Sequence, residues 1–184
     1  MALKSTIHKA ELQIADLDRG YYATHALTIA KHPSETDERM MVRLVAFAHA
    51  ASERLAFGRG ISDADEPDLW DRDLTGAIEH WIEVGLPDER VLAKAAGRSR
   101  QVSVYAYGGR AVGLWWSPIE AKVARLGNLA VFAVPQDASR ALESLARRTM
   151  QLQVTIQEGQ VLVTSADGTV TFEFEPLREA RARR

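Results

Sequence analysis

The segment that most restricts the fold is the near-continuous apolar run NLAVFAV at residues 128–134. It is far shorter than the roughly 20 apolar residues of a membrane-spanning helix. A short run of this kind is typical of a β-strand that is covered on both faces. Helix-like and strand-like segments alternate around it, so we predict a mixed α/β (α+β) fold. The 184 residues are enough for one domain with a sizeable core.

The N-terminal part of the chain has the pattern of a β-hairpin. Apolar residues alternate in residues 3–16 and 22–32, and a polar loop at 16–20 joins the two segments. The dipeptide His32-Pro33 ends the second strand. Ser34 then has the position of a helix N-cap with acids in the first turn. We predict a helix from there to about Arg54, with a buried stripe of Met41, Leu44, Val45, Ala48, Ala51 and Leu55.

In the central part, we predict strands at residues 68–74 and 78–84, joined by the turn Thr75-Gly76. Asp88 is the expected cap of a helix that runs to about Arg98, and a strand follows at 101–107. Residues 110–116 fit a strand or a helix equally well. The pair Ser117-Pro118 is typical of a helix start, so we predict a helix over 118–126.

The C-terminal part predicts a helix and then a β-meander. The helix covers residues 139–148, and the strands cover 150–157, 160–166 and 169–175, with Glu-Gly and Asp-Gly turns between them. The expected division of the single domain 1–184 is therefore a hairpin at 1–33, a core at 34–135 and a helix with a meander at 136–176. A basic tail at 177–184 is expected to fray.

Charge is distributed unevenly along the chain. The net charge of −2 argues against a general electrostatic grip on nucleic acid. Residues 34–88 carry thirteen acids against five arginines, whereas residues 89–125 carry seven basic residues against two acids. Such an order could place a cation site beside a phosphate-binding surface. The alternative is that both stretches are solvated faces of ordinary helices and loops.

The candidate metal ligands and a candidate catalytic lysine lie in residues 67–98 (PDLWDRDLTGAIEHWIEVGLPDERVLAKAAGR). Asp68 and Glu83 lie near neighbouring predicted strands and could bind one hard cation, with the Val84 carbonyl as a third ligand. Lys94 lies on the following helix and could reach back toward that site. It could equally be one of several solvated cations on that helix. The acids at 63–66 lack the glycine and glutamate spacing of a calcium loop.

Several motifs in order resemble the YaeQ family of bacterial proteins. They are MALKSTIHKAELQIADLDR at the start, HPSETDERMM (32–41), DEPDLW (65–70), WIEVGLPDER (81–90) and RTMQLQVTIQEG (148–159). The resemblance implies a variant of the PD-(D/E)XK restriction-endonuclease-like core and a Mg²⁺-dependent site. By that resemblance Asp68 matches the Asp of the PD motif, and Glu83 matches the acid of the E-x-K motif.

The same resemblance assigns two further residues. Glu38 matches the acid of the first core helix, although from the residues alone it could also be a first-turn acid favoured by the helix dipole. Gly85 stands where these nucleases keep a lysine two positions after the acid. Some members carry that lysine on the next helix, and Lys94 is the candidate here.

Two functional hypotheses follow. The first is a nuclease that uses Mg²⁺ or Mn²⁺, with Asp68 and Glu83 as metal ligands, Lys94 and Glu38 as further catalytic residues, and a nucleic acid held by Arg90, Arg98 and Arg100. The second is a non-catalytic module of the same fold that binds nucleic acid or a protein partner. An enzyme acting on small phosphorylated molecules is a third possibility, but no motif supports it.

Composition predicts the cellular compartment and excludes some kinds of site. The chain has no cysteine, which excludes a disulfide scaffold and cysteine-based zinc or nucleophile chemistry. It shows no apolar leader and no membrane-spanning run, so we expect a soluble, cytoplasmic protein without a membrane partner. His25, His32 and His80 are scattered over separate elements, which favours structural roles over a zinc site.

Overall fold

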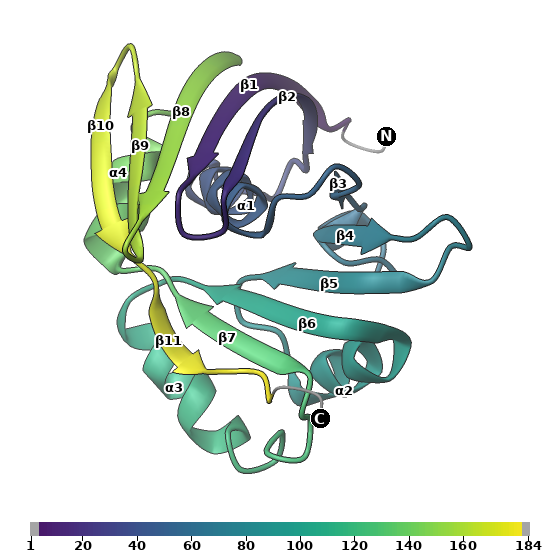
Figure 1. Cartoon of the computed structure of the whole chain (residues 1–184). Coiled ribbons are helices and arrows are strands. Elements are labelled where there is room, and N and C mark those ends of the chain that lie inside the picture. Colours follow the sequence, from purple (N-terminus) through teal and green to yellow (C-terminus); the bar gives the residue numbers. More distant parts are fainter. Residues whose placement is uncertain (1–3, 182–184) are drawn as a thin grey trace. The chain divides into compact units, whose positions relative to one another are not determined.

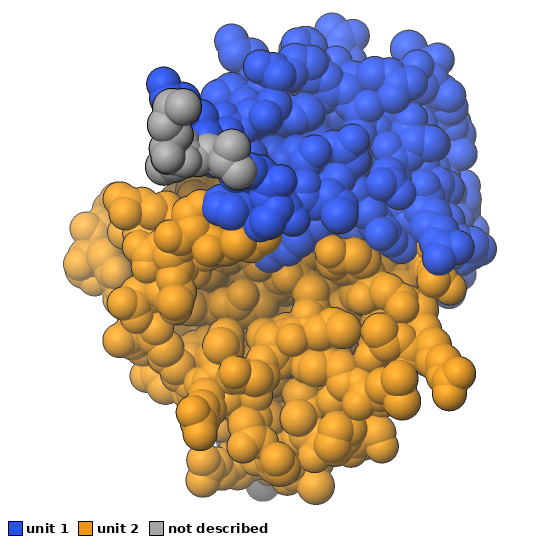
Figure 2. Space-filling view, turned by 180° about the vertical axis from the view of Figure 1, so that it is seen from behind, with its two compact units in different colours: residues 1–51, 137–174 blue, residues 52–136, 175–184 orange. Residues whose placement is uncertain are grey.

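The computed structural model describes residues 4–181, and Figure 1 shows them as helices and strands of two β-sheets. The chain divides into two compact units, coloured separately in Figure 2. Unit 1 consists of residues 1–51 and 137–174, and unit 2 consists of residues 52–136 and 175–184. The predicted mixed α+β class is confirmed.

Unit 1 contains a five-stranded sheet in which the N-terminal hairpin pairs with the strands that follow α4. Its strands are β1 (Thr6–Asp16), β2 (Tyr21–Lys31), β8 (Thr149–Gln157), β9 (Gln160–Ser165) and β10 (Gly168–Glu173), in the order β10-β9-β8-β1-β2. The hairpin and the meander are both confirmed. The parallel pairing of β1 with β8 joins them into one sheet, which the sequence did not predict.

Helix α1 (Asp37–Ala50) supplies most of the buried apolar residues that pack on this sheet. The predicted cap was wrong: Thr36 Oγ1 accepts a hydrogen bond from the amide of Arg39 at 3.1 Å. Ser34 lies 2.6 Å from His32 Nδ1 instead, and this contact holds it outside the helix. The predicted end near Arg54 was also wrong, because Ala51 turns into an extended conformation (φ −53°, ψ 138°).

An arginine from the β1–β2 turn closes the C-terminal end of α1. Arg19 Nη1 donates to the Ala51 carbonyl at 2.9 Å, and Nη2 donates to the Ala48 carbonyl at 3.3 Å. The buried carboxylate of Asp16 holds the guanidinium through Nε at 2.6 Å. The last carbonyls of a helix have no partner within the helix and carry partial negative charge. The hairpin turn therefore stabilises the end of the helix that packs beneath it.

The same helix end makes unit 1 sensitive to acid. The ring of His49 lies against Phe174 with centroids 4.6 Å apart. Burial, and then the nearby positive charge of Arg19, lower the pKa of His49 from 6.5 to about 4. The unfolded chain therefore binds the proton more tightly than the folded chain. Stability contributed by neutral His49 is present above pH 6.5 and is lost as the pH falls toward 4.

We expect His49 to account for about 2 kcal/mol of the free energy of unfolding lost between pH 7.5 and pH 5. Urea unfolding at both pH values measures this loss. The variant His49→Phe keeps an aromatic ring against Phe174 but cannot be protonated, so its loss over the same interval should be smaller by that amount. An equal loss in the variant and the natural protein would contradict the assignment.

Helix α4 (Gln136–Glu143) begins three residues earlier and ends five residues earlier than the predicted helix at 139–148. Tight turns replace the helix after Glu143: the amides of Ser144 and Leu145 bond to carbonyls three residues back. The Ser144 hydroxyl also donates to the Ala141 carbonyl at 2.6 Å. A serine that bonds to the local backbone competes with helix continuation, which explains the early end.

Unit 2 contains a six-stranded sheet with a parallel centre. Its strands are β3 (Ala56–Phe57), β4 (Leu69–Arg72), β5 (Ile78–Val84), β6 (Ser99–Ala106), β7 (Leu129–Ala133) and β11 (Glu175–Arg178), in the order β11-β7-β6-β5-β4-β3. Strands β5, β6 and β7 run parallel, and the outer pairs are antiparallel. The predicted central strands are confirmed.

Helices α2 (Glu89–Arg98) and α3 (Arg110–Ile119) bury their apolar sides in the core of unit 2. This core contains Trp81, Leu92, Val102, Val104, Trp116 and Leu129. The predicted cap of α2 is confirmed, since Asp88 Oδ1 accepts from the amides of Arg90 and Val91.

The predicted helix start at Ser117-Pro118 was wrong. Helix α3 begins at Arg110, after Gly109 with φ +61°, and Pro118 lies in its last turn. A proline there removes one hydrogen bond, to the carbonyl of Leu114. Leu114 is an exposed residue, at 67%. Burial of Val112 and Trp116 fixes the helix over the ambiguous segment 110–116.

The C-terminal tail was expected to fray from residue 177, but part of it is ordered. Residues 175–178 form β11 and pair with β7. Arg178 donates through Nη2 to the Leu126 carbonyl at 2.7 Å and through Nε to the Leu129 carbonyl at 3.2 Å. Residues 182–184 lie outside the described part. Within residues 4–181, no helix combines the length and apolar character needed to cross a membrane.

Candidate functional site

Asp68 lies immediately before β4, where the chain enters the sheet of unit 2. Its side chain is buried, at 2% exposure, and Oδ2 accepts a hydrogen bond from the Val84 amide at 2.7 Å. Leu69 pairs with Ile82 in the antiparallel register. One position further along, Asp68 therefore lies beside the Glu83–Val84 end of β5, as the sequence predicted for two acids on neighbouring strands.

Two glycines make room for this arrangement. A Cβ added at Gly60, which has φ +49°, would lie 2.4 Å from Asp68 Oδ1. A Cβ at Gly58 would lie 2.2 Å from the Pro67 carbonyl oxygen. The backbone amides of these glycines bond to the carbonyls of Asp68 and Pro67. The segment Phe57–Gly60 therefore packs directly on the acid, and the signal missed in the sequence was the pair of glycines in LAFGRG.

Glu83 extends from β5 on the same side as Trp81. The indole Nε1 of Trp81 donates to Glu83 Oε1 at 2.8 Å. Trp81 is itself fixed, because it is 2% exposed and belongs to the core under α2 and α3. Core packing thus orients one of the two predicted metal ligands, a role for Trp81 that the sequence analysis did not assign.

Lys94 is half-buried on α2, and its ammonium group already has protein partners. Nζ donates to the Ala64 carbonyl at 3.1 Å and forms a short ion pair with the Asp65 carboxylate. The hydrogen bond and charge of Lys94, with a smaller contribution from Arg98, lower the pKa of Asp65 below its ordinary value. The lysine thus reaches from α2 to the loop that precedes Asp68. No sequence pattern indicates that Asp65 would be the partner of Lys94.

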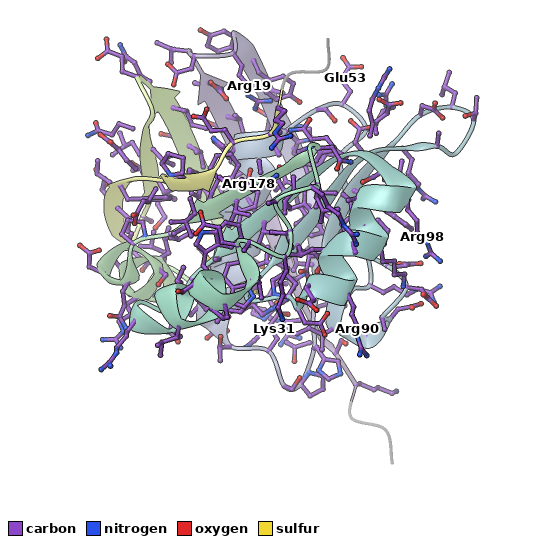
Figure 3. The ribbon with its side chains drawn as sticks, turned by 90° about the horizontal axis from the view of Figure 1, so that it is seen from below. Arg19, Lys31, Glu53, Arg90, Arg98 and Arg178 are labelled. Carbon is purple, nitrogen blue, oxygen red and sulfur yellow. The ribbon has the colours of Figure 1, made fainter. Side chains whose placement is uncertain are left out.

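The three arginines predicted to hold nucleic acid are all exposed. Figure 3 shows Arg90 and Arg98 projecting from α2. Arg98 Nη1 lies 3.9 Å from Asp65 Oδ1, and Arg100 Nη1 lies 3.1 Å from Glu79 Oε2 on β5. These exposed ion pairs contribute little to stability and leave the guanidinium groups accessible to other anions.

Glu38 belongs to unit 1, in the first turn of α1. Its Oε1 accepts a hydrogen bond from the hydroxyl of Ser139 on α4 at 2.6 Å. This contact joins α1 to α4 within unit 1. The catalytic role predicted for Glu38 stays a prediction.

The donor atoms around Asp68 and Glu83 are compatible with a hard cation that keeps much of its water. Within residues 4–181, no cluster of three or more His, Cys, Asp or Glu residues has the geometry of a metal site. Mg²⁺ is nevertheless often bound by only one or two carboxylates, with waters and substrate phosphates completing its shell. Two acids on adjacent strands fit that mode and do not fit a cage built from protein ligands alone.

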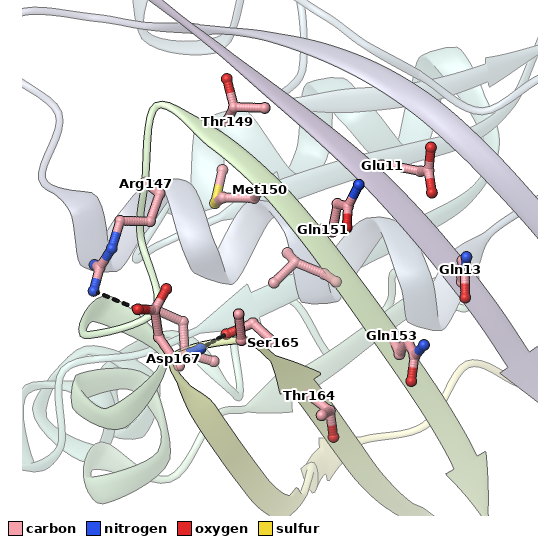
Figure 4. A pocket seen from close by; sticks show the side chains of 13 residues that line it. Glu11, Gln13, Arg147, Thr149, Met150, Gln151, Gln153, Thr164, Ser165 and Asp167 are labelled. Atoms are coloured by element: carbon pink, nitrogen blue, oxygen red, sulfur yellow. Dashed lines mark hydrogen bonds and ion pairs between the residues drawn. The ribbon is translucent and has the colours of Figure 1, made fainter.

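Unit 1 contains hollows of its own, which the predicted metal ligands do not line. One of about 460 Å³ lies on the outer face of the five-stranded sheet, and Figure 4 shows its lining. The side chains around it are mostly uncharged, among them Gln13, Gln151 and Gln153. At its rim Arg147 pairs with Asp167 at 3.1 Å. None of the residues predicted from the sequence for metal or nucleic acid lines it.

The fold and the site together define a two-unit α+β protein with a mixed sheet in each unit and a pair of strand-borne acids in unit 2. The chain belongs to the YaeQ family: the family model described as "YaeQ protein" matches residues 1–174. The resemblance stated from the sequence motifs is confirmed at the level of the family.

Relatives and solved structures agree with this membership. The chain is 47% identical over 174 residues to "Uncharacterized protein YaeQ" of Salmonella typhi, covering 95% of this chain and 96% of that protein. It is 45% identical over 161 residues to the Escherichia coli K12 protein of the same description, covering 88% and 89%.

Two crystal structures share the fold. The YaeQ protein from Xanthomonas axonopodis pv. citri has a TM-score of 0.92 at 50% identity, covering 96% of this chain and 99% of that one. The YaeQ protein from Pseudomonas syringae has a TM-score of 0.92 at 43% identity, covering 97% and 98%.

Proposed function

We propose that the chain is a Mg²⁺-dependent nuclease with a PD-(D/E)XK-like site in unit 2, in which Asp68 and Glu83 hold the ion. One observation carries this proposal: the 2.7 Å hydrogen bond from the Val84 amide to Asp68 fixes a buried carboxylate beside the acid on the next strand. Burying a carboxylate costs free energy that a hydrogen bond offsets only in part, and a role as a metal ligand would account for its presence here.

The division of roles follows from the contacts. A bound Mg²⁺ would lower the pKa of a water and offset charge on the phosphate. Asp68 would be the rigid ligand, because the Val84 amide fixes it, and Glu83 would be oriented by the Trp81 indole. The Val84 carbonyl is the proposed third protein ligand.

Lys94 would support the attacked phosphate. To do so, its ammonium must exchange the Asp65 carboxylate for the substrate anion. This exchange costs little, because Asp65 is largely exposed and the pair is screened by water. Arg90, Arg98 and Arg100, which are exposed, would contact neighbouring phosphates.

The test is cleavage of labelled single- and double-stranded DNA and RNA with Mg²⁺, Mn²⁺ or EDTA. We expect metal-dependent cleavage that Asp68→Asn lowers by about 100-fold or more, with a similar loss for Glu83→Gln. The control Glu175→Gln changes an exposed acid on β11, in the same sheet but outside the proposed site, so it should cleave normally. Absence of EDTA-sensitive cleavage, or full activity of Asp68→Asn, would refute the nuclease.

A non-catalytic module is the second candidate, and the pairing of Lys94 with Asp65 favours it. The ion pair of Lys94 with Asp65 connects α2 to the loop before β4, which is a structural role. This candidate predicts that a nucleic acid or protein partner binds equally well in Mg²⁺ and EDTA. It also predicts that Glu83→Gln and Lys94→Ala leave that affinity unchanged in a gel shift or pull-down.

A further inference from the structure

Three of the four sheet edges carry features that discourage pairing with another strand. Strand β3 has only two residues. Strand β11 contains Pro176, and its register with β7 shifts between Pro176 and Arg178. Strand β10 is six residues long, ends in Glu173 and begins at a glycine turn. Short length, proline, irregular register and charge are the usual means by which proteins protect exposed edges.

Strand β2, the fourth edge, lacks the short length, the proline and the irregular register of the other edges. It is eleven residues long and pairs with β1 over its whole length without a register shift. It contains no proline, and its only Lys, Arg, Asp or Glu is the terminal Lys31, whose Nζ is held by Asp37 at 2.5 Å. In Figure 1 β2 forms the end of the unit 1 sheet beside β1. This edge is long and regular, and it carries no Lys, Arg, Asp or Glu from Tyr21 to Ala30.

Over most of β2, the backbone groups that point away from β1 make no hydrogen bond to another residue of the described range 4–181. Within the described part of the chain, no backbone hydrogen bond joins residues 22–29 to anything except β1. Beyond that stretch, Arg43 Nη2 donates to the Ala30 carbonyl at 3.2 Å. The side chains of Ala23, His25 and Leu27 face the core and are only half-buried, so a further strand would cover more of their surface.

We propose that β2 is an interaction surface on which the β2 strand of a second copy of this chain pairs antiparallel, joining two five-stranded sheets into one. A second copy is favoured because residues 21–30 of β2 carry no Lys, Arg, Asp or Glu, so two identical strands can pair without repulsion between like charges. With a two-fold axis at Ala26, Thr24 lies opposite Thr28 of the other copy, and His25 lies opposite Leu27. No like charges lie opposite each other in this pairing. The two-fold axis repeats each cross-strand pair with the two copies exchanged.

Sedimentation equilibrium of the whole protein from about 5 to about 500 µM tests the proposal. An edge pairing covers less surface than the roughly 1,600 Å² of a stable interface, so the dimer should form in a concentration-dependent way. The variant Thr24→Lys/Thr28→Lys places lysines along the outward side of β2. Lysine faces lysine in the antiparallel pairing, so we expect its dimer to dissociate at least about tenfold more readily.

The matched control is Thr169→Lys/Thr171→Lys on β10, the opposite edge of the same sheet, where both threonines are also exposed. It should dimerise like the natural protein. A charge-reversed variant, Thr24→Glu/Thr28→Glu, should be weakened alone to a similar degree but form a heterodimer with the lysine variant. A natural protein that stays monomeric throughout, or a folded lysine variant that dimerises normally, would overturn the proposal. Circular dichroism establishes that each variant is folded.

Discussion

Replacing Glu35 by alanine should lower the free energy of unfolding by about 3–5 kcal/mol, because the change leaves a charged guanidinium buried without its anion. Glu35 and Arg43 have side chains only 2% and 6% exposed. Arg43 contacts both carboxylate oxygens, with Nε–Oε1 at 2.8 Å and Nη2–Oε2 at 2.7 Å. This two-point geometry is the strongest form of an arginine–carboxylate pair.

Further contacts complete the cluster around Glu35. Arg39 Nη1 donates to Oε1 at 2.9 Å, and the His32 amide donates to Oε2 at 3.3 Å. The cluster therefore joins the end of β2 to α1 through the segment that precedes the helix. Urea unfolding of Glu35→Ala measures the predicted loss, and a drop in the midpoint without a change in slope would show that the two-state transition is retained.

Two variants separate charge burial from lost packing. The double variant Glu35→Leu/Arg43→Met removes both charges and keeps apolar volume, so it should recover most of the stability lost by Glu35→Ala. Arg39→Ala removes a more exposed partner, with 15% of its side chain accessible, and should cost about 1 kcal/mol or less. If the double variant is no more stable than Glu35→Ala, the unpaired charge is not the cause of the loss.

Elements with local signals could be predicted from the sequence. The hairpin, the meander and α2 depend on alternation, glycine turns and the Asp88 cap, all of which act over a few residues. The errors occurred where two local signals compete. Ser34 and Thr36 can each cap a helix, and the contact of Ser34 with the His32 ring decided between them.

Pairing between distant segments could not be predicted. Nothing local indicates that β1 pairs parallel with β8, or that β11 adds to the edge of β7, because such pairing depends on packing of the whole sheet. The candidate site shows the same division. The position of Asp68 next to a strand could be predicted from the local sequence. The Lys94–Asp65 ion pair could not, because only the fold brings these two residues together.

Replacement of Trp81 by alanine should cost about 3–5 kcal/mol of stability, because it empties a site in the centre of the unit 2 core. Trp81 meets Trp70 edge-to-face with centroids 6.4 Å apart, and its indole also holds Glu83. Trp81→Phe keeps an aromatic ring in the site but removes the indole donor and part of the ring volume. Its stability loss should therefore be smaller, about 1–3 kcal/mol, since the lost hydrogen bond is to a charged group.

The two Trp81 variants also connect the core to the proposed metal site. If Glu83 binds Mn²⁺, loss of the indole that orients it should weaken Mn²⁺ binding by about 10- to 100-fold in Trp81→Phe. Trp70→Phe is the matched control, because Trp70 lies on the adjacent strand and makes no hydrogen bond to Glu83. Titration calorimetry on the folded variants measures both affinities. Equal Mn²⁺ affinity in the two phenylalanine variants would mean that the Trp81–Glu83 contact serves the core alone.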